Sequence, residues 1–259
     1  MSALLAGLCS ISFRKLDAES VLRMAIDCGL DCIEWGSDVH APAADPRGAA
    51  ALAKRCSDAG LCCPSYGSYF FAGQNDASEL SPLLDTTRAL GASTIRIWAP
   101  FGIDSSAAAD ERGRIADAVR VAAAMAAEQD LSVALEFHPG TLTETAASTV
   151  ALLEDAGDNV FSYWQPAPGA SAEHSLSELA LVRRRLAHLH VFSWDPTPDD
   201  RHPLDHLESM WRSALFEAAR DRAFAGPRCA YLEFLPDDDP QALRRDAAVL
   251  IRWIQEEAS

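Results

Sequence analysis

Residues 132–141 read SVALEFHPGT, and their character changes abruptly from apolar to polar. The run at 133–135 is wholly apolar, which is typical of a short strand buried on both faces. Glu136 and His138 lie two residues apart, so on a strand their side chains point to the same side. The Pro-Gly pair at 139–140 then ends the strand. A carboxylate and an imidazole at the end of a buried strand are costly unless they are paired, hydrogen-bonded or bound to metal.

Three later stretches have the same form, an apolar strand that ends in a Gln, a His or a Glu. They read YWQP at 163–166, HLHVFSW at 188–194 and YLEF at 231–234. We therefore expect these strand ends, together with Glu136, to converge on one metal site.

Predicted strands and helices alternate along the whole chain. We expect strands at 4–9, 32–35, 61–66 and 94–98, within the opening stretch, and at 160–164, 186–192 and 229–234. Helices are expected at 17–28, 46–59, 76–90, 107–128, 143–156, 176–185, 207–222 and 240–256. Strict alternation favours a parallel sheet with helical crossovers, and eight such units match a (β/α)8 TIM barrel. The predicted fold class is thus α/β, a single TIM-barrel domain spanning residues 1–259.

A doubly wound open sheet is the alternative to the barrel. Such a sheet normally carries a glycine-rich phosphate loop after its first strand. The corresponding stretch here reads CSISFRK at 9–15, which contains no glycine. The barrel is therefore the favoured architecture.

The composition argues against several classes of partner. The 259 residues carry a formal net charge of −16, from 22 basic and 38 acidic side chains. Such a surface repels phosphate backbones, so we expect no nucleic-acid partner. No apolar run approaches the ~20 residues of a membrane span, so we expect no membrane partner either. The sequence leaves the oligomeric state open, a homo-oligomer included.

The cysteines and the N-terminal residues indicate a reduced, cytoplasmic protein. Seven cysteines are present, an odd number, and no CxxC pair occurs. That pattern does not suit a disulfide scaffold. Residues 1–13 lack a basic segment and a long apolar core, so we expect no signal peptide.

In a TIM barrel the active site lies at the carboxyl ends of the strands, where the polar strand-end residues would face one cavity. The candidate metal ligands are Glu136, Gln165, His190 and Glu233. Two carboxylates, an amide oxygen and an imidazole nitrogen suit one divalent metal ion, Mn²⁺, Mg²⁺, Co²⁺ or Zn²⁺. The two carboxylates would balance its charge.

In their order along the chain, the motifs resemble those of the xylose isomerase-like TIM barrels, the sugar phosphate isomerase/epimerase family. The resemblance covers nearly the whole chain, and the motifs that carry it are IEWGSDVH at 33–40, RIWAP at 96–100, LEFHPGT at 135–141, YWQP at 163–166, HLHVF at 188–192 and LEF at 232–234. It implies one divalent metal ion held by residues from strands five to eight. It also implies that Glu136 and Glu233 act as acid and base on opposite faces of a bound sugar, with His190 as a further metal ligand.

The chain departs from the family pattern at several positions. Gln165 stands where the family usually has an Asp ligand, and its amide oxygen brings no charge. Ketose epimerases of the group also hold the sugar with a Glu, a His and an Arg, where this chain has Leu142, Pro168 and Pro196. The resemblance therefore supports the metal chemistry but not that particular sugar clamp.

The predicted function is that of a metal-dependent sugar isomerase or epimerase, acting on a small carbohydrate or hydroxy-carbonyl compound. One glutamate removes the proton beside the carbonyl, the metal stabilises the enediolate, and the other glutamate returns a proton. Two alternatives stay open. The same enediolate could expel a β-substituent, as in a dehydratase or lyase acting on a keto-sugar or keto-inositol. The neutral Gln165 and the missing clamp would also fit a catalytically silent sugar-binding barrel.

Five further residues are candidates for contact with the substrate: His40, Arg96, Trp98, His138 and His188. Ordinary packing is the alternative for each of them. Arg96 can instead pair with Glu34 inside the barrel. His188 is expected one layer below His190, where a packing or ligand-supporting role is favoured.

Overall fold

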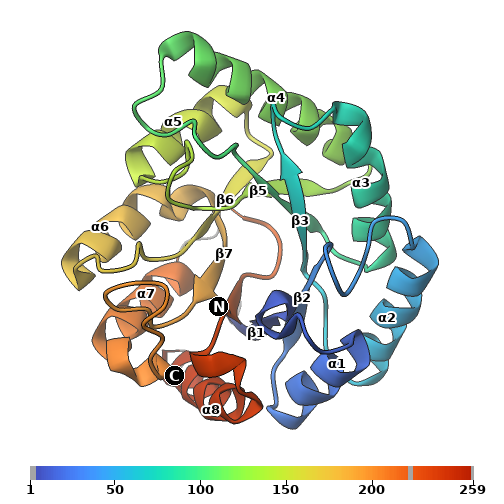
Figure 1. Ribbon diagram of the computed structural model, residues 1–259, viewed down its shortest axis with the longest axis vertical. Coiled ribbons are helices and arrows are strands. Elements are labelled where there is room, and N and C mark those ends of the chain that lie inside the picture. Colours follow the sequence, from blue (N-terminus) through green and yellow to red (C-terminus); the bar gives the residue numbers. More distant parts are fainter. Residues whose placement is uncertain (1–3, 221–223, 258–259) are drawn as a thin grey trace.

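The computed structural model describes residues 4–220 and 224–257, and within them eight parallel strands form a closed barrel (Figure 1). The strands are β1 (Leu5–Cys9), β2 (Cys32–Gly36), β3 (Ser65–Phe71), β4 (Thr94–Trp98), β5 (Ser132–Leu135), β6 (Val160–Trp164), β7 (Leu186–Val191) and β8 (Cys229–Leu232). An outer ring of α-helices surrounds them: α1 (Ala18–Asp27), α2 (Pro46–Asp58), α3 (Leu80–Ala89), α4 (Ala109–Ala127), α5 (Ala146–Ala156), α6 (Ala172–Val182), α7 (Glu208–Arg220) and α8 (Pro240–Glu257).

Closure of the barrel rests on the pairing of the last strand with the first. Consecutive strands are neighbours throughout, and β8 pairs with β1, where Leu5 lies opposite Cys229 and Leu8 opposite Leu232. Every strand therefore has a partner on both sides. The predicted TIM barrel is confirmed, and the open sheet is excluded because it would leave two unpaired edges.

Helices α1, α2, α5 and α6 begin where a side chain caps a free N–H group. Asp17 accepts a hydrogen bond from the backbone N–H of Ser20 at 2.7 Å, which starts α1 at the predicted place. Helix α6 begins at Ala172, earlier than the predicted residue 176. The reason is the cap at Ser171, whose side chain accepts from the backbone N–H of His174 at 3.2 Å.

Strand β3 lies further along the chain than the sequence predicts. The expected strand is 61–66, whereas β3 spans Ser65–Phe71. Pro64 has no N–H to donate to a ladder, so regular pairing begins after it. Tyr69, Phe70 and Phe71, which follow the predicted strand, belong to β3, and Phe71 lies opposite Trp98 of β4.

Other boundaries differ from the predictions by a few residues. Strand β8 ends at Leu232, before the predicted end at 234. The helix predicted at 207–222 is α7, and its last predicted residues lie outside the described part of the chain. Residues 1–3, on which part of the signal-peptide prediction falls, lie outside it as well.

Each helix buries one side against the barrel. In α8, Leu243, Leu250 and Trp253 are fully buried, and their spacing of seven and three residues is that of one helix face. Among residues 4–220 and 224–257, no helix is long and apolar enough to cross a membrane.

The lower part of the barrel interior is filled by aromatic rings. The ring of His188 lies beside those of Tyr163 and Tyr231, with centroids 5.1 and 5.5 Å away, and all three residues are buried. This packing makes the interior a core rather than a pore. The polar strand ends lie above it, at the carboxyl ends of the strands.

Candidate metal centre

Three side-chain oxygens converge on one nitrogen of His190, which lies near the end of β7. Its Nδ1 is 3.0 Å from Oε1 of Gln165, 3.2 Å from Oε1 of Glu136 and 3.4 Å from Oε2 of Glu233. Each of these three residues comes directly after the last residue of its strand: Gln165 after β6, Glu136 after β5 and Glu233 after β8. None of the four residues is more than 6% exposed. The structure thus brings together all four residues that the sequence suggests as metal ligands.

The backbone beyond β5 and β8 remains strand-like, and this aims the two glutamates inward. The N–H of Glu136 donates to the carbonyl oxygen of Ile97 at 2.9 Å, and the N–H of Glu233 donates to that of Val191 at 3.1 Å. Both glutamates therefore continue the barrel ladder by one bond before the chain turns away. A side chain fixed in this way loses little further entropy when it binds an ion.

The four converging side chains fit a metal ion because they contain more oxygens that accept hydrogen bonds than N–H groups that can donate to them. A neutral imidazole carries at most one N–H, and at Nδ1 it could serve only one of the three oxygens fully. Among the described residues, the Glu233 carboxylate has the imidazole of His190 as its ion-pair partner and receives no hydrogen bond. Buried carboxylates and amide oxygens left in this state are the ligands that divalent cations take.

Arg96, on β4, lies fully buried between two carboxylates. Its Nη1 donates a short hydrogen bond to Oε2 of Glu136, and its Nε is 3.2 Å from Oε1 of Glu34 on β2. The pairing of Arg96 with Glu34 that the sequence left as an alternative is therefore present. Contact with Glu136 was not foreseen, and it places the arginine inside the cluster rather than free in the cavity.

The formal charges of this cluster leave an excess that a cation can balance when His190 is neutral, the form in which an imidazole binds metal. Glu34, Glu136 and Glu233 bring three negative charges, and Arg96 brings one positive charge. With His190 neutral, two negative charges remain in a nearly buried space. One divalent ion would offset both, which agrees with the chemistry of the four converging residues.

Gly67 of β3 makes room for this ion-pair cluster. A Cβ at this position would lie 2.6 Å from Nη2 of Arg96 and 2.9 Å from Oε1 of Glu34. Both neighbours are buried and held by their own contacts, so neither can move aside without loss. Any larger residue at 67 would therefore push the guanidinium out of place.

The two glutamates at the metal centre differ in their surroundings. Burial raises the pKa of Glu136, but attraction to Arg96 and to His190 outweighs burial and holds the pKa at about 2. Burial also raises the pKa of Glu233; His190 lowers it and the charge of Glu136 raises it, with a net upward shift. Burial lowers the pKa of His190, but Glu233 and Glu136 together raise it above its usual value. Glu136 is thus held ionised by direct contact with Arg96, whereas Arg96 makes no such contact with Glu233 and lowers its pKa too little to offset burial.

A second group of possible ligands lies on the other side of His190. Atoms of Cys9, Glu34 and His190 that can bind metal all lie within 4.8 Å of one another. Cys9 ends β1, and its Sγ donates to Oε1 of Glu34 at 3.4 Å. Tyr163 of β6 donates a short hydrogen bond to the other oxygen of Glu34.

Cys9 and Tyr163 belong to this site but are not among the residues predicted for it. A signal was present for both, because Cys9 closes its strand and Tyr163 lies two residues before Gln165, on the same side of the strand. Neither residue stands out without knowledge of Glu34, since a buried cysteine or tyrosine usually packs in a core.

The mouth of the barrel carries an aromatic wall on the side of β4 and β5. The ring of Trp98 lies 5.5 Å from that of Phe101 and 5.1 Å from that of His138, centroid to centroid. Phe101 is 52% exposed, and Nδ1 of His138 faces the carbonyl oxygen of Pro139 at 2.8 Å. Two of the predicted substrate-contact residues, Trp98 and His138, therefore lie in this wall, Trp98 buried and His138 half-buried.

The other two histidines in that prediction have partners within the chain. Both ring nitrogens of His40 are engaged, Nδ1 with Oγ of Ser10 at 3.0 Å and Nε2 with the carbonyl oxygen of Leu16 at 3.1 Å. His188 accepts from the backbone N–H of Cys229 at 3.2 Å, in the aromatic layer below the mouth. The geometry favours a structural role for both over contact with a substrate.

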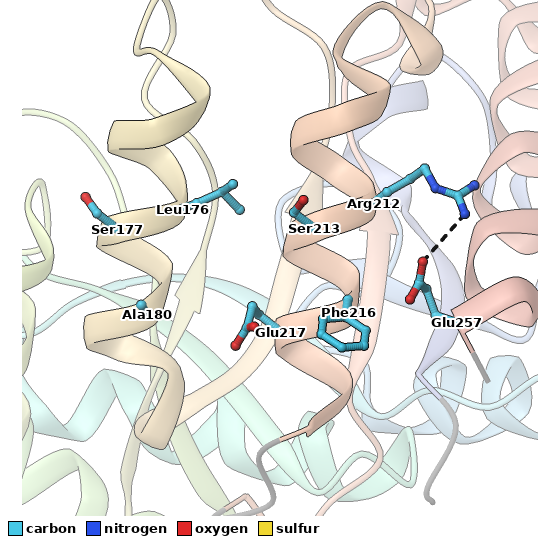
Figure 2. Close-up of a pocket in the computed structure, with 8 residues that line it drawn as sticks. All are labelled: Leu176, Ser177, Ala180, Arg212, Ser213, Phe216, Glu217 and Glu257. Atoms are coloured by element: carbon cyan, nitrogen blue, oxygen red, sulfur yellow. Dashed lines mark ion pairs between the residues drawn. The ribbon is translucent and has the colours of Figure 1, made fainter. Parts of the chain in front are cut away.

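Two hollows lie near the surface of the barrel. One, of about 380 Å³, is lined by Arg14, Lys15, Arg201 and Phe234 among others, residues of the loops that follow β1, β7 and β8. The other, of about 640 Å³, lies on the outer wall between α6 and α7 (Figure 2). The outer hollow is lined by side chains such as Phe216, far from the strand ends, so it is not part of the metal centre.

Three solved structures share this fold over nearly their whole length. The probable 3-DHS dehydratase AsbF from Bacillus anthracis, involved in petrobactin synthesis, is 18% identical with a TM-score of 0.72, covering 96% of this chain and 99% of that one. The IOLI protein, solved with a bound zinc atom, is 15% identical with a TM-score of 0.73, covering 98% and 99%. An L-ribulose 3-epimerase is 17% identical with a TM-score of 0.71, covering 100% and 96%. At such low identity, these similarities show the fold alone.

Sequence comparison identifies the family. Comparison with curated proteins found no match to the chain. The family described as xylose isomerase-like TIM barrel matches residues 22–253, a range that includes the four residues of the metal centre. The chain therefore belongs to the xylose isomerase-like TIM barrel family.

Proposed function

We propose that the protein is a divalent-metal-dependent isomerase or epimerase of a small carbohydrate or hydroxy-carbonyl compound. The observation that carries the proposal is the convergence of three side-chain oxygens, from the ends of β5, β6 and β8, on one imidazole nitrogen of β7. The two excess negative charges of the cluster support a divalent ion. Membership of the family, and a fold shared with an L-ribulose 3-epimerase, support the type of reaction.

The residues of the centre divide into ligands and proton carriers. Glu136, Gln165, His190 and Glu233 would hold the ion, which would polarise the substrate carbonyl and offset the negative charge that develops on it. One glutamate removes the proton from the carbon beside the carbonyl, and the other delivers a proton. Delivery to the opposite face of the same carbon gives an epimer, and delivery to the neighbouring carbon gives an isomer. Arg96 fixes Glu136 through the oxygen that does not face His190.

Burial of the two glutamates keeps bulk water away from the reacting carbon. Glu136 and Glu233 are 2% and 4% exposed, so few water molecules reach either carboxylate. The second glutamate, rather than water, would then deliver the proton, and each glutamate would exchange its proton with solvent between turnovers. The same burial strengthens the attraction between the carboxylates and a bound cation.

The mouth offers a surface for a small ligand with hydroxyl groups. The wall of Trp98, Phe101 and His138 suits the apolar face of a sugar, and Nε2 of His138 has no partner among the described residues. Leu142 occupies the position of the sugar-binding glutamate of ketose epimerases, and it is buried. We therefore expect the substrate to be held differently from the ketose in those enzymes.

Metal analysis and isotope exchange test the proposal. The purified protein should contain close to one divalent ion per chain, and removing the ion should abolish activity. With a panel of ketoses and keto-inositols in D₂O, the proton beside the carbonyl should exchange and an epimer or isomer should appear in NMR spectra. Glu136→Gln and Glu233→Gln should keep the fold but lose exchange. Glu217→Gln, on the outer wall, is the matched control and should exchange at the wild-type rate.

Two outcomes would contradict the proposal. One is a protein that binds no divalent metal under any condition in which it is folded. The other is a Glu233→Gln variant with full metal content and full turnover, which would make Glu233 a structural residue. The first result would favour a catalytically silent sugar-binding barrel, and the second would assign the proton transfer to another group.

A dehydratase is the second candidate, and the fold shared with a probable 3-DHS dehydratase favours it, together with the missing ketose clamp. The first step is the same removal of a proton beside the carbonyl. The electron pair then forms a carbon–carbon double bond and expels the β-hydroxyl, which takes a proton from the second glutamate and leaves as water. The product is a conjugated enone that absorbs in the ultraviolet. Exchange without any rise in ultraviolet absorbance would favour the isomerase.

A further inference from the structure

We propose that Glu34 is the positioning residue of the metal centre, because its one carboxylate orients His190 directly and Glu136 through Arg96. The proposal rests on the proposed function, since it takes the cluster around Nδ1 of His190 as the metal site. Glu34 itself does not face that cluster. It lies on the opposite side of the imidazole, in the layer between the metal centre and the aromatic core.

Glu34 faces hydrogen-bond donors from four different strands. Oε1 faces the thiol of Cys9 at 3.4 Å, Nε of Arg96 at 3.2 Å and Nε2 of His190 at 3.5 Å, and Oε2 accepts from the hydroxyl of Tyr163. The residue is completely buried on β2. A carboxylate in this position is costly unless it is well paired, so its contacts hold it in one place.

The first effect of Glu34 is on the imidazole. Nε2 of His190 faces Oε1 of Glu34 at 3.5 Å, an ion-pair separation without a hydrogen bond, and Nδ1 faces Gln165, Glu136 and Glu233 on the other side of the ring. A hydrogen on Nε2, attracted by the carboxylate, leaves the lone pair of Nδ1 directed at the metal position. Metal-binding histidines commonly present their second N–H to a carboxylate in this way, which fixes both the tautomer and the ring orientation.

The second effect of Glu34 is on Glu136, and it acts through Arg96. The guanidinium is shared, with Nε toward Glu34 and Nη1 bonded to Oε2 of Glu136. Oε1 of Glu136 is thereby left toward the metal position. Without the charge of Glu34, the whole positive charge of Arg96 would act on Glu136 and compete with the metal ion for it.

The same contacts argue against Glu34 as a metal ligand in its own right. With Cys9 and His190 it forms the second group of possible ligands. An ion at that place would lie against the guanidinium of Arg96, a fixed positive charge only 3.2 Å from Oε1 of Glu34. We therefore assign Glu34 to holding His190 and Arg96.

The substitution Glu34→Gln tests the assignment, because it removes the charge and keeps the shape. The amide oxygen can take the place of Oε1, and the amide NH₂ can donate to the hydroxyl of Tyr163, so the fold is expected to persist. Metal affinity, measured by titration calorimetry on the metal-free protein, should fall by about 10- to 100-fold. Glu217→Gln is the matched control: it removes an acidic charge on the outer wall, away from the cluster, and should leave metal affinity at the wild-type value.

Nitrogen-15 NMR of the histidine ring provides a readout that does not depend on a variant. In the Zn²⁺-loaded wild-type protein, we expect the proton of His190 on Nε2 and none on Nδ1. The opposite pattern would overturn the proposal. So would a Glu34→Gln variant that binds metal as tightly as the wild type. A wild-type protein that binds no divalent metal would instead overturn the proposed function, so the two failures are distinguishable.

Discussion

The side-chain oxygen of Gln165 lies 3.0 Å from Nδ1 of His190, closer than either of the two glutamates that face the same nitrogen. By position Gln165 is a full member of the cluster, and it differs from its neighbours in carrying no charge. The cluster without it already has the charge to balance one divalent ion. A carboxylate at position 165 would therefore raise metal affinity without raising turnover.

The first prediction is that Gln165→Asp raises metal affinity, by about tenfold or more, because the ion gains a charged partner in a nearly buried site. Turnover at saturating metal should not rise. The added charge weakens the pull of the ion on the substrate carbonyl, and the substitution removes an amide N–H that can hold a substrate oxygen. Titration calorimetry measures the affinity, and steady-state kinetics measure the turnover.

Gln165→Asn is the matched control for this prediction, since it shortens the side chain by the same amount without adding charge. The ratio of metal affinities between the Asp and Asn variants isolates the effect of the charge. Equal affinities in the two variants would place Gln165 outside the ligand set and assign it to the substrate or to packing.

The sequence predicts those residues of the site that lie at the ends of successive strands. Glu136, Gln165, His190 and Glu233 were identified because an abrupt change from apolar to polar residues is visible locally. Parallel strands of a barrel bring their carboxyl ends together, so local patterns were enough to predict that the four side chains meet. Whether they bind a metal remains a prediction that the titrations above address.

The layer beneath the site could be predicted only in part: the pairing of Glu34 with Arg96 was one of the alternatives, but the bond of Glu34 to Tyr163 depends on the register between strands distant in sequence. Glu34 and Tyr163 are bonded although 129 residues separate them. Nothing in either local sequence points to the other. The position of β3 was missed for a local reason, since Pro64 interrupts an apolar run that otherwise reads as the start of a strand.

The second prediction concerns the stability of the buried ion pairs. Arg96→Met should destabilise the metal-free protein by about 3–5 kcal/mol, because it leaves Glu34 and Glu136 buried without their shared cation. Divalent metal should restore part of this loss, since the ion offsets the same charge. Urea unfolding with and without metal measures both effects.

Lys54→Met is the control for the loss of a positive charge. Lys54 pairs with Asp58 one turn along α2 at 2.6 Å, and both side chains are well exposed. Its loss should change the free energy of unfolding by at most about 0.5 kcal/mol. Similar losses in the two variants would mean that the buried carboxylates do not depend on Arg96.

The third prediction concerns Glu144, which joins two loops at the mouth of the barrel. Its carboxylate accepts from the N–H and the hydroxyl of Ser105 at 3.0 and 2.6 Å, and from the N–H of Gly140 at 3.1 Å. The bonds to Ser105 lower the pKa of Glu144, burial raises it, and the net shift is downward. A carboxylate with a lowered pKa in the folded state stabilises the fold above its unfolded pKa and ceases to do so as the pH falls.

Glu144→Gln should therefore reduce stability at neutral pH, and its difference from the wild type should shrink between about pH 5 and about pH 3. Urea unfolding across that range provides the comparison. Glu154→Gln is the control for removing an acidic side chain, since Glu154 is exposed and has no ion pair within the described ranges. A difference that grows as the pH falls would contradict the prediction.

The last prediction concerns the carboxyl ends of α1 to α4, which are followed by the same type of backbone hydrogen bond. Leu30, Leu61, Ala92 and Leu131 each donate their N–H to the carbonyl oxygen five residues earlier, at 2.9–3.1 Å. The residue before each donor has a positive φ, and it is a glycine after α1, α2 and α3. After α4 it is Asp130, with φ of 58°.

Asp130→Gly should stabilise the protein by about 1 kcal/mol, because a side chain in the left-handed region is strained and glycine is not. Removing a negative charge next to the carboxyl end of α4 acts in the same direction. Gly91→Ala is the mirror experiment, since φ there is +71° and an added Cβ would meet nothing within 4 Å. It should cost about 1 kcal/mol through backbone strain alone. Urea unfolding measures both variants, and if Gly91→Ala is destabilising while Asp130→Gly changes nothing, local bonds of the aspartate side chain must already offset the strain at position 130.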